Sequence, residues 1–114
     1  MTNEFLDYVE DMIENMEKAE LLVQDVDFEQ FETDFRINYA VVRALEIVGE
    51  ATKRLPMELR EQYPDVPWRE MAGMRDRIVH GYDIVDLRIV WRTVQERIPQ
   101  VKPQLKQMLA DFER

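Results

Sequence analysis

The fold is decided by the stretch DFRINYAVVRALEIVGEATKRL, residues 34–55. Its apolar side chains recur every three or four positions, the spacing of one face of an α-helix. Asp34 or Thr33 can cap the start of this helix, Pro56 stops it, and the small Gly49 lets another helix approach closely. A helix apolar over so wide a face should be central in the fold. The predicted stripe contains Ile37, Val41, Ala44, Val48, Ala51 and Leu55, widened by Tyr39, Val42 and Leu45.

The segment before this stretch predicts two further helices. Residues 4–24 carry apolar residues at helical spacing on one face and acidic residues on the other. Asp27 is placed to cap a short helix at residues 28–32, because its side chain can accept a hydrogen bond from a free backbone N–H.

The segment after Pro56 predicts shorter helices. Residues 57–66 form a short helical piece, and Pro67 is placed to open a helix that runs from residue 68 to 79 or 80. Gly81 is the expected cap at its end.

The final segment, residues 86–112, has an apolar seam with alternating steps of four and three residues. Pro99 and Pro103 lie within it and should kink or split the helix. Because the seam resumes in register after both prolines, we expect a bent helix packed along a bundle. The seam is Leu87, Trp91, Val94, Ile98, Val101, Leu105, Met108 and Phe112.

These patterns predict an all-α fold, an antiparallel bundle of about four to five helices in a single domain at residues 1–114. We see no credible strand pair, and 3 glycines with 5 prolines argue against a turn-rich sheet protein. The chain has no cysteine, no apolar run of ~18 residues and no signal-like N-terminus, so we expect a cytoplasmic protein with no membrane span.

The charge is unevenly divided along the chain. The net charge is −9, but residues 1–50 hold 14 acids and 3 bases, whereas residues 51–114 hold 10 acids and 12 bases. A local basic surface is therefore possible on an acidic protein, although the simpler interpretation is that these charges solvate helix faces. The bases in question include Lys53, Arg54, Arg60, Arg69, Arg77, Arg88 and Arg92.

The stretch RDRIVHGY, residues 75–82, contains the chain's only histidine, His80. Any acid–base chemistry near neutral pH should pass through it, and Arg75 suggests a phosphate-bearing substrate. Residues five apart on an ideal helix differ by about 140° around the axis. A joint site therefore needs the helix to end near Val79, or a dimer cleft that combines two copies.

Such a pair can promote RNA cleavage by the RNA's own 2′-hydroxyl, with His80 moving a proton and Arg75 stabilising the phosphoryl charge. This route needs no metal or other cofactor, and the sequence offers no histidine–carboxylate cluster for one. The structural alternatives are a packing or capping role for His80, an ion pair of Arg75 with Glu70 or Asp76, and a core position for Tyr82 with its hydroxyl at the rim.

These residues resemble a known family. Arg-x4-His-x-Tyr at 75–82 is similar to the signature of the HepT-like toxins in the HEPN superfamily. Further similar elements occur in the same order, namely Phe31 with Asp34, IVGEATK at 47–53, YPDVPW at 63–68, GMRD at 73–76, HGY at 80–82 and VW at 90–91.

The resemblance implies an all-helical homodimer with two copies of the motif lining a cleft, and metal-independent endoribonuclease activity used as a toxin against tRNA or mRNA. It assigns catalysis to Arg75 and His80. The residue after that arginine is often Asn in the family, and here it is Asp76. Its carboxylate would repel the scissile phosphate unless it pairs with Arg77 or orients His80.

The resemblance also implies control of the toxin at Tyr82. In the family a separate MNT-type nucleotidyltransferase, the antitoxin, adds AMP to this tyrosine, which would block the cleft and repel RNA phosphates. The alternative hypothesis is a non-catalytic helical module that binds a nucleotide or scaffolds a nucleotidyltransferase, which the acidic net charge would favour.

Overall fold

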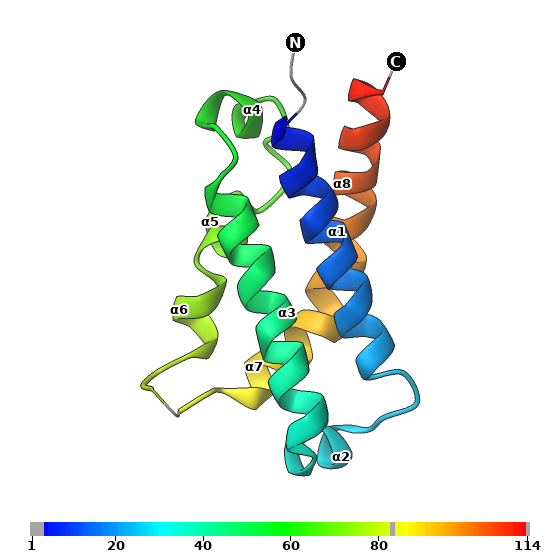
Figure 1. The fold of residues 1–114 in the computed structure, drawn as a ribbon, viewed down its shortest axis with the longest axis vertical. Helices are drawn as coiled ribbons and strands as arrows, with labels where there is room; N and C mark the ends of the chain where they lie inside the picture. The colour runs from blue at the N-terminus through cyan, green and yellow to red at the C-terminus, as the bar shows by residue number, and fades with distance from the viewer. Residues whose placement is uncertain (1–3, 83, 114) are drawn as a thin grey trace.

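The computed structural model describes residues 4–82 and 84–113. Three helical rods form the body of the fold: α1 (Glu4–Leu22), α3 (Phe35–Lys53), and a third rod made of α7 (Leu87–Arg92), the π-helical turn η1 (Thr93–Arg97) and α8 (Ile98–Phe112). Figure 1 shows α1 between α3 and α8 and antiparallel to both. The predicted all-α antiparallel bundle is confirmed.

Side-chain caps fix the turn that leads from α1 into α3. Asp27 Oδ1 accepts from the Gln30 N–H at 2.8 Å, and the Gln30 side chain accepts from the Asp27 N–H, which together form a capping box for α2 (Phe28–Thr33). Asp34 then caps α3 by accepting from the Arg36 N–H at 3.0 Å. Asp27 was the predicted cap of α2, and of the two candidates for α3, Asp34 and Thr33, the structure has Asp34.

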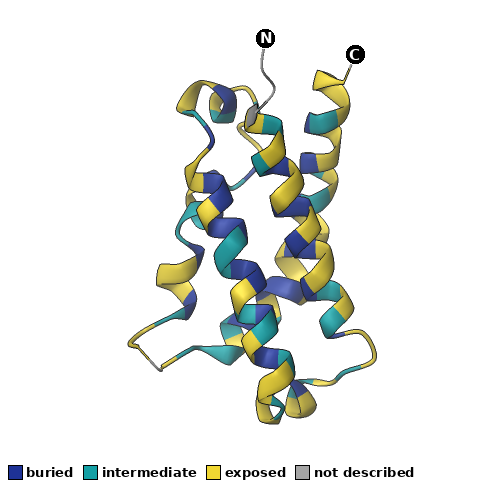
Figure 2. Ribbon diagram, viewed as in Figure 1, coloured by how far each residue is buried: buried dark blue, intermediate teal, exposed yellow. Residues whose placement is uncertain are grey.

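The buried side chains lie on the faces of the three rods that are turned toward one another (Figure 2). Phe31 is fully buried and its ring centroid lies 5.3 Å from that of Trp91, so α2 is anchored to α7. Most of the predicted stripe of α3 is buried, but the prediction for Tyr39 is wrong, since 74% of it is exposed. The fully buried large side chains include Met12, Met16, Leu45, Met71, Met74, Ile78, Ile98, Leu105 and Met108.

Gly49 is where the chain after α3 packs most closely on the central helix. A Cβ placed on Gly49 would lie 3.2 Å from the Met71 carbonyl oxygen and 3.3 Å from Met74 Cβ. A larger residue would push these neighbours away from α3. The predicted close approach at Gly49 is confirmed, and it sets the position of the segment that carries Arg75.

The segment after α3 contains more helices, and shorter ones, than the sequence predicted. The segment 57–66 yields only α4 (Met57–Glu61), and Pro67 lies just before α5 (Trp68–Ala72). The indole N–H of Trp68 donates to the carbonyls of Arg60 at 3.0 Å and Tyr63 at 2.9 Å. This tryptophan therefore ties α5 to the end of α4.

The helix predicted for residues 68 to 79 or 80 is broken at Gly73. Glycine is a poor helix former, and the backbone here turns with φ −87° and ψ 14° before α6 (Met74–Ile78) begins. The second helix ends at Ile78, because Val79 is extended (φ −109°, ψ 115°). The prediction that Gly81 caps this helix is therefore wrong, and His80 lies outside it.

A small hairpin follows α6. Val79 and Val85 form an antiparallel bridge, the His80 N–H donates to the Ile84 carbonyl at 2.7 Å, and the Asp86 N–H donates to the Ile78 carbonyl at 2.7 Å. These bonds compete with continuation of the helix at residue 79. The bridge is the only strand-like pairing among the described residues.

The π turn η1 shifts the apolar seam of the third rod. After η1 the buried residues follow the prediction as far as Met108, but the predicted Phe112 is exposed. Before η1 the buried residue is Val90, whereas the predicted Leu87 and Trp91 are only half-buried. A turn with i→i+5 bonding holds one extra residue, so the seam moves by one position. Pro99 follows in the first turn of α8, where its missing N–H costs nothing. No helix in the described part of the chain is long and apolar enough to cross a membrane.

Candidate active site

Arg75 lies on α6, and its side chain is directed toward α3. Its Nε is 3.5 Å from Glu46 Oε2, and the arginine side chain is 67% exposed whereas the glutamate side chain is 23% exposed. The partner is therefore neither Glu70 nor Asp76, the two residues of the structural alternative considered for Arg75. An exposed guanidinium held by a mostly buried carboxylate keeps donors free for a phosphate.

His80 lies two residues beyond the end of α6, in the first arm of the hairpin, and is exposed. Its backbone is fixed by the bond to Ile84, while its imidazole has no hydrogen bond to any other described residue. Of the two geometries considered for a joint site, the helix that ends near Val79 is present. No ion pair or hydrogen bond joins Arg75 to His80 within the described residues.

Tyr82 is fully exposed in the hairpin. It lines a shallow pocket of about 380 Å³ with Tyr39 and Glu46 of α3, beside Val85 and Leu87. A position in the core is thereby excluded, and the phenol is accessible to another protein.

Asp76 is exposed, and its side chain has no hydrogen bond or ion pair with another described residue. It does not pair with Arg77, whose guanidinium binds Glu70 instead. Neither of the two roles considered for this carboxylate is present in the structure.

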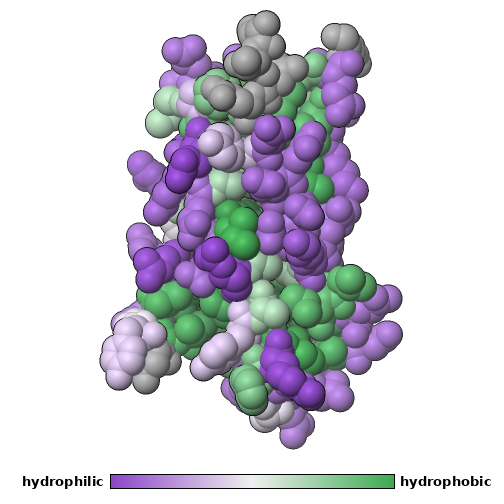
Figure 3. Space-filling model, viewed as in Figure 1, coloured by the Kyte–Doolittle hydropathy of each residue, from purple (hydrophilic) through white to green (hydrophobic). Residues whose placement is uncertain are grey.

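An apolar surface adjoins these residues. We call it the α3–hairpin face, and it consists of Phe35, Tyr39, Tyr82 and Ile84, all of them exposed. The rings of Phe35 and Tyr39 meet edge to face with centroids 5.9 Å apart. Figure 3 shows apolar side chains gathered in the lower part of the view, where α3 begins, whereas the upper part is mainly hydrophilic. In the sequence, the four-residue spacing of Phe35 and Tyr39 indicates that both lie on one helix face. The prediction missed this exposed face because it assigned Tyr39 to the buried stripe of α3.

A family model described as "Ribonuclease HepT-like" matches residues 12–108, which include α6 and the hairpin. The chain belongs to the HepT-like ribonuclease family. The resemblance drawn from the sequence motifs is thus confirmed at the level of the family.

Named relatives of this HepT-like chain support the assignment to the family. It is 44% identical over 102 residues to a protein named "Probable ribonuclease HepT" from Thermococcus cleftensis, covering 90% of this chain and 93% of the relative. It is 39% identical over 110 residues to a "Putative RNase" of Methanocaldococcus jannaschii, covering 96% and 89%. A "Putative RNase" of Caldanaerobacter subterraneus is 43% identical over 102 residues, covering 90% and 91%. No solved structure matches the chain.

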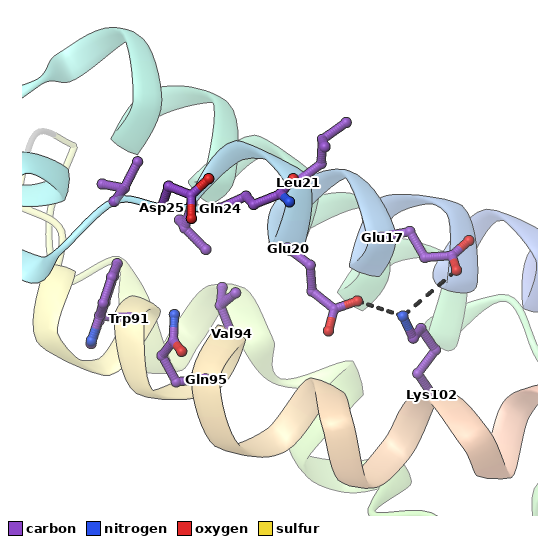
Figure 4. Close-up of a pocket in the computed structure, with 11 residues that line it drawn as sticks. Glu17, Glu20, Leu21, Gln24, Asp25, Trp91, Val94, Gln95 and Lys102 are labelled. Carbon is purple, nitrogen blue, oxygen red and sulfur yellow. Dashed lines mark hydrogen bonds and ion pairs between the residues drawn. The ribbon is translucent and has the colours of Figure 1, made fainter.

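A cavity of about 650 Å³ in this HepT-like chain lies elsewhere, between the end of α1 and η1 (Figure 4). Lys102 reaches between Glu17 and Glu20, as the dashed lines show. Hydrogen bonding from Lys106 lowers the pKa of Glu17, and hydrogen bonding to Glu20 raises the pKa of Lys102. With Asp25 also on its wall, the cavity carries excess negative charge and would repel RNA phosphates.

Among the residues that the structure describes, no group of three histidine or carboxylate side chains is placed to hold a metal ion.

Proposed function

We propose that this HepT-like protein is a metal-independent endoribonuclease toxin with Arg75 and His80 as its catalytic residues. The observation that carries the proposal is their placement within the segment that the family model matches. Glu46 pairs with Arg75 and leaves its guanidinium exposed, and His80 is exposed just beyond the end of the same short helix. The acidic cavity of Figure 4 has the wrong charge for RNA.

The reaction is transfer of a phosphoryl group within the RNA. The 2′-oxygen attacks phosphorus, the bond to the 5′-oxygen breaks, and the products are a 2′,3′-cyclic phosphate and a 5′-hydroxyl. His80 takes the proton from the 2′-hydroxyl or gives one to the leaving 5′-oxygen. Arg75 binds the phosphoryl oxygens as negative charge builds on them.

The proposal includes a homodimer formed through the α3–hairpin face. A patch of exposed aromatic and aliphatic side chains of this kind marks an interface. Each chain has one histidine, whereas the reaction uses both an acid and a base. A symmetric dimer across this face brings two His80 side chains to one cleft, because His80 and Tyr82 lie in the hairpin that borders it.

Control at Tyr82 is the remaining part of the proposal. The phenol is fully exposed two residues from His80, so a partner nucleotidyltransferase of the MNT type can reach it. AMP on Tyr82 would place a phosphate and a base beside the cleft, which excludes RNA by charge and by volume. The proposal therefore includes a cytoplasmic toxin–antitoxin pair made up of this protein and that nucleotidyltransferase.

The test is cleavage of a mixed tRNA and mRNA pool in EDTA by wild type and by His80→Ala, with both proteins shown by mass to carry no AMP. Cleavage by wild type alone, leaving cyclic-phosphate or 3′-phosphate ends, supports the proposal. Equal cleavage by both proteins rules out His80 as the catalyst, and no cleavage by either points to the non-catalytic module. Circular dichroism should show that His80→Ala keeps its helices, because His80 is exposed and outside them.

A further inference from the structure

A second pocket, of about 310 Å³, lies between η1 and the side of α6 that faces away from α3. Its walls include three arginines, Arg77, Arg92 and Arg97, together with Thr93 and Glu96. Three guanidiniums around so small a space are unusual on a protein with a net charge of −9. The pocket therefore concentrates positive charge in one place.

The π turn is what brings two of these arginines together. Arg92 and Arg97 are five residues apart, and on an α-helix they would differ by about 140° around the axis. In η1 the hydrogen bonds run from i to i+5, so residues five apart lie one above the other. Both side chains consequently line the same pocket. Such π turns are frequent at functional sites.

Glu70 fixes the other side of the pocket. Its carboxylate is mostly buried, and its Oε1 accepts from both Arg77 Nη1 and Arg97 Nε, the latter at 2.9 Å. The Arg92 side chain has no hydrogen bond or ion pair with another described residue. Three positively charged guanidiniums surround the pocket together with two carboxylates, those of Glu70 and Glu96. The sum is one positive charge, which a ligand with one negative charge would balance. A phosphodiester carries one negative charge.

The pocket and the candidate active site lie on opposite sides of the short helix α6. Arg75 and Arg77 are two residues apart, which separates them by about 200° around the helix axis. Arg75 accordingly reaches Glu46 on α3, and Arg77 reaches Glu70 on the opposite side. A single RNA strand that crosses this five-residue helix meets both sides.

We propose that the pocket formed by Arg77, Arg92 and Arg97 binds one backbone phosphate of the RNA strand, on the side of α6 opposite the proposed cleavage site. The inference rests on the proposed ribonuclease function and adds a substrate-binding subsite to it. Arg92 is the main contact, since its guanidinium is free, and Glu70 orients the other two. The contact recognises the backbone and carries no base specificity.

The test measures binding of a fluorescein-labelled single-stranded RNA to the His80→Ala protein as a function of NaCl concentration. We compare Arg92→Gln and Arg97→Gln with Arg54→Gln, each added to His80→Ala. Arg54 is the matched control, because it is also exposed and unpaired but lies at the far end of α3. Losing a phosphate contact should reduce the slope of log K against log salt by about 0.7.

The inference predicts this reduction for Arg92→Gln and Arg97→Gln and an unchanged slope for Arg54→Gln, with Arg92→Lys keeping most of the wild-type slope. In the active protein, Arg92→Gln should raise KM more than it lowers kcat. Equal slopes for Arg92→Gln and Arg54→Gln would overturn the subsite, even if wild type cleaves RNA. A reduced slope in a protein that never cleaves RNA would support the subsite and refute the endoribonuclease proposal.

Discussion

The guanidinium of Arg75 lies 3.5 Å from the carboxylate of Glu46, an ion pair that joins α6 to the central helix α3. Glu46 is mostly buried against the bundle, so it fixes where the arginine can reach, while the exposed side of the guanidinium stays open. The ion pair therefore links the central helix of the fold to the proposed phosphate contact.

We predict that Glu46→Gln lowers kcat/KM for RNA cleavage by about ten- to a hundredfold, because a misplaced catalytic group costs that much. The free energy of unfolding should change by no more than about 1 kcal/mol, since Arg75 is exposed. Steady-state cleavage and urea unfolding measure the two effects. Glu50→Gln is the control, because it breaks a different ion pair on α3, with Arg43. Equal activity of both variants would show that Glu46 does not position Arg75.

Acid should weaken the fold at the start of α3. The hydrogen bond from the Arg36 side chain lowers the pKa of Asp34, which also caps the helix. A lowered pKa in the folded state means that the charged form stabilises the protein above the unfolded pKa of about 3.9. This stabilisation disappears as the pH falls through the lower folded pKa.

Asp34→Asn should consequently have a lower Tm than wild type at neutral pH, with a difference that stays constant down to about pH 5. Below about pH 4 the difference should shrink, because wild type then loses the same charge. Thermal unfolding across this pH range measures the effect. Asp65→Asn is the control, since Asp65 is exposed and has no partner among the described residues. A gap that widens in acid would contradict the assignment.

The fold follows closely from local patterns in the sequence. The caps at Asp27 and Asp34 and the close approach at Gly49 each depend on a few neighbouring residues, and all three are present. The hairpin after α6 could not be predicted, because the pairing of Val79 with Val85 leaves no signal in the helical periodicity. The core position predicted for Tyr39 is wrong because helical spacing cannot distinguish a buried stripe from an exposed apolar face.

The residue types of the candidate site are evident in the sequence, whereas their arrangement in space is not. The single histidine and its neighbouring arginine stand out in composition, but the partner Glu46 lies 29 positions earlier in the chain, beyond any local pattern. The arginine pocket depends on the π turn η1, whose i→i+5 bonding no periodicity in the sequence revealed. The sequence therefore did not reveal Glu46 as the partner, because that contact is long-range, or the arginine pocket, because it depends on a helix irregularity.

The α3–hairpin face should hold two chains together. Tyr39→Lys places a charge where the proposed interface is apolar, so we expect the dimer dissociation constant to rise more than about tenfold, which corresponds to 1.4 kcal/mol. Sedimentation equilibrium measures it. Met57→Lys is the control, because Met57 is as exposed as the residues of this face but lies on α4. A wild-type mass equal to a single chain, 13.8 kDa, would remove the dimer from the proposal.

Tyr82 should be the only tyrosine on this face that accepts AMP. When the protein is produced together with an MNT-type nucleotidyltransferase, intact mass should show added AMP on wild type and none on Tyr82→Phe. Tyr39→Phe is the matched control, since Tyr39 is also exposed and lines the same pocket. Both variants should change the free energy of unfolding by less than about 0.5 kcal/mol, because only an exposed hydroxyl is lost. AMP that remains on Tyr82→Phe and disappears from Tyr39→Phe would move the modification site from the hairpin to α3.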